Sequence, residues 1–400
     1  MDTVSWIVIE DFEVTGSNDQ RVSKAGVRAV APAGSAAGNI AVRRCHIHHN
    51  GEWGVFTGHV NAMLLEQNLI HEMWDEHGIY LSNSGDNHIV RDNVIWGNSS
   101  NGLHVNSDAS QGGDGVMRNV LVERNTLYSN GGGSTYIDGG GVSRTSVGGG
   151  SAVNFDGVRD SIIRNNLMYD NRASGISLYR IDGLLGAGNN LVVNNTIHNA
   201  ASGRWCVNIS DGSTGNTVFN NILLNNHSFR GAIFASADSL PGLVSDYNIV
   251  IDRFDRGAGV VSLATWRTQT GQDAHSTALA AAAWPGLFAS LAGADYRLAS
   301  GSAARNAGAA SLNGRAAPAD DLLGNARPRE AVFDIGAFEF GAAVPCQVEF
   351  DGVPGVGVPD IFAFLALWFA MDVRADYNGS GGTPDVPDIF AFLAAWFEGC

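Results

Sequence analysis

Residues 63–73 read MLLEQNLIHEM: a short apolar run, an asparagine at position 68 and a second apolar pair. Nearly the same phrase occurs seven times along the chain. Its central position is held in turn by Cys45, Asn68, Asn93, Asn125, Asn166, Asn195 and Asn221. The shortest steps between these positions are 23 and 25 residues. A nearly fixed period in this range predicts a solenoid.

A second phrase, Gly/Ala-apolar-x-apolar, runs in step with the first. Its first three copies start 24 residues apart, at Gly54, Gly78 and Gly102. Strand alternation places the second residue of every copy on one side of the strand. These inward residues are Val55, Ile79, Leu103, Val153, Ile176, Val207 and Ile233. The runs are short and β-branched, so we expect at least two strands per turn, stacked as parallel sheets around an apolar interior.

The two phrases together resemble the right-handed parallel β-helix of the pectate-lyase-like superfamily. The resemblance covers roughly residues 5 to 340 and implies an all-β solenoid over residues 1–340, with inward asparagines stacked at one corner. An asparagine amide both donates and accepts, so it can pair the backbone groups that a tight corner leaves over. Asparagine also tolerates the left-handed conformation that we expect at such corners. We therefore predict a structural ladder. The scaffold hosts many chemistries, so the resemblance is weak for activity.

Composition excludes several classes of partner. The chain has 400 residues and a formal net charge of −16, and Lys24 is its only lysine. This balance argues against nucleic acid or an anionic membrane as partner. No stretch is long and apolar enough to span a bilayer. No export signal is present in this chain, which opens inside a strand pattern, so we expect a natural protein that is longer at its N-terminus, with a leader and a first-coil cap.

The asparagine phrase stops before residue 241. An alanine-rich segment within 241–300 predicts a helical insertion packed on the solenoid side. Residues 295–308 and 321–340 then resemble the closing coils of secreted bacterial β-helix proteins, which implies that the apolar strand Val332–Phe340 seals the core. Residues 341–345, GAAVP, read as a linker.

From residue 346 to residue 400 the chain repeats with a different period. PDIFAFLALWF (359–369) recurs as PDIFAFLAAWF (387–397), each with proline and aspartate in the first turn of an amphipathic helix. Oxygen ligands at loop positions 1, 3 and 5 with glycine at 6 suit Ca²⁺. Asp376, Asn378 and Ser380 fill those positions, and Asp388 closes the loop one residue late unless Asp385 substitutes.

This helical pair resembles a dockerin-like module of the type found in planctomycete secreted proteins. The first loop departs further from the pattern, with Glu349 and Asp351 as its ligands. The resemblance implies Ca²⁺, a cohesin-like or cell-surface anchoring partner, and a secreted or cell-surface location. A degenerate helical pair that no longer binds metal is the alternative.

The four cysteines fall into two groups. Cys346 and Cys400 bracket the helical pair, and we predict a disulfide between them, with about 4 kcal/mol of stabilisation for so long a loop and an oxidising setting. Cys45 and Cys206 lie several turns apart, so we expect both to be unpaired core residues.

Two columns of outward residues are the candidate site. The first is Phe56, Tyr80, His104, Asn154, Ser177, Asn208 and Phe234. The second is Gly58, Ser82, Asn106, Asp156, Tyr179, Ser210 and Ser236. Aromatic faces stack on pyranose rings, and amides and carboxylates bridge hydroxyls, so we expect a trough that binds a polysaccharide. The expected substrate-binding residues are Glu76, His77, Asn106, Asn154, Tyr179, Trp205 and Asn208.

Three functions fit this pattern. A polyuronate lyase, slightly preferred, would use His104 or Tyr80 as base and Arg180 to stabilise the developing charge. A glycoside hydrolase would pair Asp156 with Asp108 or Asp182. A non-catalytic glycan-binding or surface-anchored protein is the third, in which these are ordinary solvated positions. The trough is a second candidate location for Ca²⁺.

His46, His48 and His49 form a cluster in HIHHN. Alternation places His46 and His48 on one face of a strand. An exposed pair is preferred to a metal site, because the sequence shows no third ligand.

Overall fold

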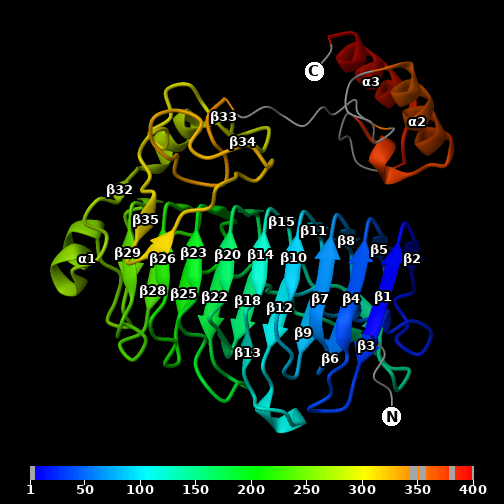
Figure 1. The fold of residues 1–400 in the computed structure, drawn as a ribbon, viewed down its shortest axis with the longest axis horizontal. Coiled ribbons are helices and arrows are strands. Elements are labelled where there is room, and N and C mark those ends of the chain that lie inside the picture. The colour runs from blue at the N-terminus through cyan, green and yellow to red at the C-terminus, as the bar shows by residue number, and fades with distance from the viewer. Residues whose placement is uncertain (1–4, 342–349, 351–356, 378–382, 399–400) are drawn as a thin grey trace. The chain divides into compact units, whose positions relative to one another are not determined.

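The chain divides into two compact units, Met1–Gly341 and Ala342–Cys400. The structure is a computed structural model that describes residues 5–341, 350, 357–377 and 383–398. The first unit is a β-solenoid whose strands lie in successive coils (Figure 1). Among the described residues no helix has the length and apolarity needed to cross a membrane.

Three parallel sheets form the solenoid, one more than the minimum predicted. The first sheet contains β1 (Ser5–Glu10), β4 (Gly38–Arg43), β7 (Asn61–Glu66), β10 (Ile89–Arg91), β14 (Leu121–Glu123), β20 (Ile162–Arg164), β23 (Leu191–Val193), β26 (Thr217–Phe219) and β29 (Val244–Asp246). The second contains β2 (Glu13–Thr15), β5 (His46–His48), β8 (Leu69–His71), β11 (Val94–Trp96), β15 (Thr126–Tyr128), β21 (Leu167–Tyr169), β24 (Thr196–Asn199), β27 (Ile222–Asn225), β30 (Ile249–Val250) and β32 (Thr277–Ala278). The third contains β3 (Ala25–Val30), β6 (Trp53–Gly58), β9 (Ile79–Ser82), β12 (Leu103–Asn106), β18 (Val153–Asp156), β22 (Ile176–Tyr179), β25 (Val207–Ile209), β28 (Ile233–Ala235) and β31 (Phe254–Asp255).

Short strands and helices lie outside the three long sheets. Four two-stranded sheets pair β13 (Met117–Arg118) with β19 (Val158–Arg159), β16 (Thr135–Ile137) with β17 (Ser143–Thr145), β33 (Phe288–Ser290) with β34 (Asp295–Leu298), and β35 (Ser311–Leu312) with β36 (Arg315–Ala316). The helices of the first unit are η1 (Ala109–Gln111), α1 (Leu263–Thr270) and η2 (Ala281–Leu287).

The predicted inward column is confirmed. Val55, Ile79 and Leu103 are fully buried, as are their counterparts in the later coils. They belong to one continuous apolar cluster that runs the length of the solenoid. Cys45 and Cys206 are buried and unpaired, which confirms the prediction for both.

The asparagine ladder is also confirmed. The side-chain amide of Asn68 donates to Asn93 Oδ1 at 2.9 Å, and that of Asn93 donates to Asn125 Oδ1 at 2.9 Å. The same contact repeats up to Asn221, which donates to Asn248, a rung that the sequence analysis missed. A second ladder, also missed, lies five residues further on and joins Asn98, Asn130 and Asn171.

The left-handed conformation is not adopted by the ladder asparagines themselves, so that part of the prediction is wrong. It is adopted by the residue just before each rung, such as Gln67 (φ 56°), Asp92 (φ 57°) and Arg124 (φ 51°). The side chain of the rung asparagine then points into the core. The side-chain amide of Asn93, for example, donates to Arg91 O, two residues earlier, and to Leu65 O in the preceding coil. The asparagine is therefore required for its hydrogen bonds rather than for its backbone freedom.

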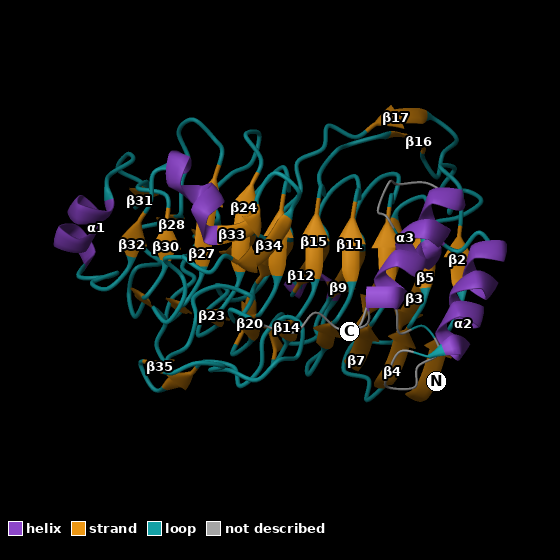
Figure 2. Ribbon diagram, turned by 90° about the horizontal axis from the view of Figure 1, so that it is seen from above, coloured by secondary structure: helices purple, strands orange, loops and turns teal. Residues whose placement is uncertain are grey.

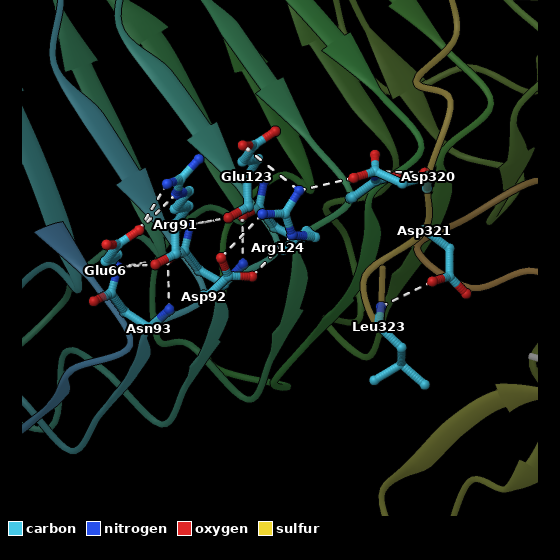
Figure 3. A network of polar contacts seen from close by, with 12 residues as sticks. Glu66, Arg91, Asp92, Asn93, Glu123, Arg124, Asp320, Asp321 and Leu323 are labelled. Carbon is cyan, nitrogen blue, oxygen red and sulfur yellow. Dashed lines mark hydrogen bonds and ion pairs between the residues drawn. The ribbon is translucent and has the colours of Figure 1, made fainter. Parts of the chain in front are cut away.

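Charges alternate along the outer face of the first sheet. Glu10, Arg43, Glu66, Arg91, Glu123 and Arg164 occupy one register position in successive strands. Glu66 pairs with Arg91 at 2.7 Å (Figure 3). Opposite charges on neighbouring strands favour this register over a slipped one. Arg124 beside this row bonds Asp92 and Asp320, each at 2.8 Å, and so ties the segment after the coils to the solenoid.

The far end of the solenoid differs from prediction in two ways. The predicted alanine-rich insertion contains η2, whose Trp284 and Leu287 pack on the outside of the second sheet as expected. Helix α1, which precedes it, was not expected as a separate element and lies past the last coil (Figure 2). Its Trp266 is fully buried, stacks on Phe254 at 5.2 Å and joins the main core, so the helix caps that end. Residues 332–340 form no strand and do not seal this core. Ile335 and Phe338 instead pack with Leu167 and other residues of the second sheet in a separate cluster.

The second unit repeats itself structurally as well as in sequence. Its elements are α2 (Val358–Phe369), η3 (Val373–Ala375) and α3 (Val386–Glu398). Phe364 and Phe392 stack at 4.1 Å in its centre. The indole N–H of Trp368 donates to Asp385 O at 2.8 Å, and that of Trp396 donates to Gly357 O at 3.0 Å. Each helix thus holds the turn before the other.

Candidate functional site

The third sheet carries the predicted columns on its outer side, in the predicted register, except that Ser210 and Ser236 lie just past the ends of β25 and β28. One strand position runs through Phe56, Tyr80, His104, Asn154, Ser177, Asn208 and Phe234. A second runs through Gly58, Ser82, Asn106, Asp156 and Tyr179. We call the surface formed by these two columns the third-sheet face. His104 and Asp156 therefore lie on the same face.

Four rings form a continuous row at one end of the third-sheet face. Trp53 stacks on Phe56 at 4.3 Å, and Phe56 meets Tyr80 edge-on at 5.6 Å. Tyr80 then stacks on His104 at 4.9 Å with the planes 15° apart. All four rings are half-buried or more. The row therefore places aromatic rings next to one another along successive coils.

His77 fixes the protonation pattern of His104. The backbone N–H of Asn101 points at His77 Nδ1 at 3.3 Å, so this nitrogen must accept. A neutral imidazole has one donor and one acceptor, so His77 carries its proton on Nε2. That N–H donates to His104 Nδ1 at 2.9 Å, which leaves the proton of His104 on Nε2. Burial lowers the pKa of His104 to about 3 and that of His77 well below its usual value, so both rings are neutral.

The Nε2–H of His104 is buried and has no hydrogen-bond partner among the described residues. A buried donor without an acceptor costs about 1–3 kcal/mol, which an oxygen of a bound ligand would recover. This N–H is therefore a candidate donor to a ligand oxygen.

Amide and phenol groups pair beside it. Asn106 donates to Tyr80 Oη at 3.0 Å and to Asp182 Oδ2 at 3.1 Å. In the next coils Asn154 donates to Tyr179 Oη at 2.9 Å. Burial raises the pKa of Tyr80 to about 12 and that of Tyr179 above its ordinary value. The side-chain oxygen of Asn106 is buried and, within the described parts of the chain, has no donor.

Two of the predicted catalytic carboxylates are held by backbone groups. Asp156 is 1% exposed and accepts the N–H groups of Ile181, Asp182 and Gly183 at 2.9–3.1 Å. Burial nevertheless raises its pKa. Asp108 accepts Ser110 N at 2.8 Å and caps η1. Asp156 thus anchors the loop that carries Asp182, and Asp108 begins the neighbouring loop.

An acidic edge lies just before the third sheet. One oxygen from each of Glu52, Asp75 and Glu76 lies within 4.8 Å of the other two. Burial raises the pKa of Glu52 to about 7 despite its 2.9 Å bond to Lys24, and it raises the pKa of Glu76 as well. Glu76 accepts the indole N–H of Trp53 at 2.8 Å, so this edge adjoins the row of rings. Carboxylate oxygens at these distances fit the donor set of Ca²⁺.

The remaining predicted residues are more dispersed. Arg180 is exposed at the end of β22, next to Tyr179. Asn208 is half-buried in the first column and donates weakly to Ser210 Oγ at 3.4 Å. Trp205 is only 7% exposed and packs against Phe234 at 5.9 Å, four coils away from Tyr80 in the strand order.

The histidine cluster on the second sheet has more members than the sequence indicated. Glu13 Oε1 lies 3.1 Å from His48 Nε2, and His71 Nε2 lies 2.7 Å from His46 Nε2. The view that no third ligand is at hand is therefore wrong. The signal was present in the sequence, because Glu13 and His71 occupy the matching positions of the neighbouring coils.

The predicted calcium ligands fall partly outside the described residues. Asn378, Ser380, Glu349 and Asp351 lie there, as do Cys346 and Cys400. Asp376 follows η3, and Asp388 lies in the first turn of α3. Asp388 is fully buried and accepts Asp385 N at 2.7 Å, just as Asp360 accepts Gly357 N at 2.8 Å. The two aspartates hold the two turns in the same way.

Comparison with known proteins places the chain in a family. Residues 7–146 and 118–246 match the family described as right handed beta helix region, and the chain belongs to that family. No curated protein matches the sequence.

Solved structures resemble the chain at 14% identity. A protein titled glycoside hydrolase covers 55% of this chain with a TM-score of 0.43, and this chain spans only 46% of its length. The A-module of the Azotobacter vinelandii mannuronan C-5 epimerase AlgE6 has a TM-score of 0.37, and the match covers 61% of this chain and 74% of the A-module. DFA-IIIase from Arthrobacter chlorophenolicus A6 without its lid has a TM-score of 0.37, and the match covers 84% of this chain and 75% of the DFA-IIIase chain.

Proposed function

We propose that the protein is carbohydrate-active and that a polysaccharide lies along the third-sheet face. The observation that carries the proposal is the row of four rings from Trp53 to His104, which ends in a buried, unpartnered N–H. Aromatic faces stack on sugar rings, and a buried donor takes a sugar oxygen. Neighbouring strands lie about 4.8 Å apart, so successive coils present these groups on the scale of sugar units.

β-Elimination on a uronate-containing chain is the preferred reaction. His104 Nε2–H and the guanidinium of Arg180 would bind the uronate carboxylate and stabilise the negative charge that develops there. Because His104 holds its proton toward the ligand, it acts as a donor, and Tyr80 is the candidate base. The phenolate removes the proton next to the carboxyl, the electron pair forms a carbon–carbon double bond, and the glycosidic C–O bond breaks. The leaving oxygen takes a proton, and an unsaturated sugar end results.

Hydrolysis is the second candidate, favoured by the raised pKa values of Asp156 and Glu76. A raised pKa favours the protonated form of a carboxyl group, which is the form that a general acid needs. Asp156 would work with Asp108 or Asp182, and the three N–H groups that bind Asp156 weigh against it.

Product release from polysaccharides tests these reactions. The purified full chain is incubated with pectin, alginate and neutral glycans, while ultraviolet absorbance follows unsaturated ends and a reducing-sugar assay follows all cleavage. The lyase account expects unsaturated ends, their loss in Tyr80→Phe and a large decrease in His104→Ala. Reducing sugar without unsaturated ends, abolished in Asp156→Asn alone, supports the hydrolase. Binding without any product supports the glycan-binding or surface-anchored alternative.

We also propose that the second unit is a dockerin-like, Ca²⁺-binding module that attaches the secreted protein to a cohesin-like or cell-surface partner. The support is the internal symmetry, in which Asp360 and Asp388 hold equivalent turns before equivalent helices. Calorimetric titration of the full chain with Ca²⁺, compared with Asp376→Ala, tests the module. Unchanged heat in the variant contradicts the assignment of the second loop.

A further inference from the structure

Four histidines and two glutamates gather on the outer face of the second sheet. Glu13 comes from β2, His46 and His48 from β5, and His71 from β8, with His49 and Glu72 just after their strands. One ligand atom from each of Glu13, His46 and His48 lies within 4.8 Å of the other two. The rings pack closely, with His46 and His48 4.3 Å apart and His48 and His71 5.2 Å apart. This face is separate from the third-sheet face.

A hydrogen-bond chain links Glu72, His71 and His46. His71 Nδ1 lies 2.9 Å from Glu72 Oε2, so Nδ1–H donates to the carboxylate and Nε2 keeps a lone pair. His46 Nε2, 2.7 Å from that lone pair, is the donor. Glu72 thus fixes His71, and His71 in turn orients the ring of His46.

A second chain joins His49, His48 and Glu13. A carboxylate oxygen can only accept, so His48 Nε2–H donates to Glu13 Oε1, 3.1 Å away. The other nitrogen of a neutral His48, Nδ1, then accepts from His49 Nδ1, 2.7 Å away. A divalent cation bound by Glu13 and His48 would displace the proton between them.

We propose that Glu13, His46 and His48 bind one divalent transition-metal ion of the Zn²⁺ class. Imidazole nitrogens with one carboxylate are ligands for such ions, whereas Ca²⁺ prefers oxygen alone. Tetrahedral ligands at about 2.1 Å from a metal lie about 3.4 Å from one another, so a pair at the 4.8 Å limit would close by about 1.4 Å. Glu13 is largely exposed and can supply that movement. Three protein ligands leave a fourth position for water or another ligand, and the ion links β2 to β5.

Calorimetric titration of the full chain with ZnCl₂ tests the site. Excess CaCl₂ is present to fill any oxygen-only sites, and the protein is first stripped with a chelator. We expect one tightly bound Zn²⁺ that raises the melting temperature, and at least a tenfold weaker affinity in Glu13→Gln and His48→Ala. Glu72→Gln, which touches no metal, is expected to weaken binding less than Glu13→Gln does, because it loosens only His71, which orients His46.

His275→Ala is the matched control, since His275 is an exposed imidazole bonded to Asp246 at 2.7 Å with no second histidine near it among the described residues. The affinity of the His275→Ala variant for Zn²⁺ should equal that of the unaltered chain. Glu13 and Glu72 are exposed enough that their glutamine variants will fold even if His48→Ala does not. No Zn²⁺ binding, or equal binding in Glu13→Gln, overturns the proposal. The proposal does not depend on the reaction at the third-sheet face.

Discussion

Removing one rung from the middle of the asparagine ladder should destabilise the whole solenoid. Asn125 is fully buried, and its amide donates to Val90 O, Glu123 O and Asn166 Oδ1 at 2.8–3.0 Å. Its oxygen accepts the backbone N–H of Asn93 at 3.0 Å and the side-chain N–H at 2.9 Å. Asn125→Ala removes all of these contacts at once.

The magnitude follows from the groups left without partners. The backbone N–H of Asn93 and the carbonyl of Val90 both lose a bond inside the core. Each buried unsatisfied group costs about 1–3 kcal/mol, so the expected loss is about 4 kcal/mol of unfolding free energy. Asn208→Ala is the control, because that asparagine makes one side-chain bond of 3.4 Å on the outer face. Its expected cost is below about 1 kcal/mol.

Guanidinium unfolding followed by circular dichroism measures both variants. The ladder account requires a much larger loss for Asn125→Ala than for Asn208→Ala. Equal midpoints, or a loss below about 1 kcal/mol for Asn125→Ala, would show that the inward asparagines are not structural.

Three further outcomes follow from the structure. Trp266→Ala removes the fully buried ring that caps the solenoid, so thermal melting should show a loss of about 3–5 kcal/mol. Glu339→Gln removes the carboxylate bonded to the buried Arg327 at 2.7 Å and leaves Asp321 and Asp334 as its remaining counter-charges, and the same assay should show a loss of about 3 kcal/mol. β-Elimination should accelerate as pH rises from neutrality, because the phenolate of Tyr80 becomes more populated up to its pKa of about 12. A hydrolase that relies on a protonated carboxyl should instead slow in alkali.

The repeating parts of the fold could be predicted because each coil of a solenoid repeats the same residue pattern, and this pattern fixes the strand register. Once the asparagines were aligned, each outward column followed by counting, and Tyr80 and His104 fell on adjacent strands as expected. The second ladder and the alternating charges carry equally regular signals, five residues after and two residues before each rung. They are detectable in principle from Asn98 and Asn130, or from Glu66 and Arg91.

The end of the solenoid could not be predicted in the same way. Strand Val332–Phe340 was expected from the resemblance of this segment to closing coils, but these residues cover Leu167 and its neighbours on the outside of the second sheet. An outward apolar position on a strand looks the same in the sequence whether solvent or another segment faces it. Trp266 gave no sign of a cap, because the cap depends on where the last coil ends.

The chemistry of the third-sheet face could be predicted from the sequence only in part. The residue types were predictable, but the role of His104 depends on a backbone N–H of Asn101 that sets the tautomer of His77. Asp156 was read as a catalytic acid from its column, and the structure adds three backbone donors that the sequence could not reveal.

The central claim is that a polysaccharide binds the third-sheet face. The most direct test compares oligosaccharide affinity in Tyr80→Ala and Tyr128→Ala by calorimetry. Both are half-buried tyrosines in stacked ring rows, but Tyr128 lies on the second sheet between Trp96 and Tyr169. We predict at least about tenfold weaker binding for Tyr80→Ala and less than a twofold change for Tyr128→Ala. Equal affinities in both variants, or the opposite order, would contradict the claim.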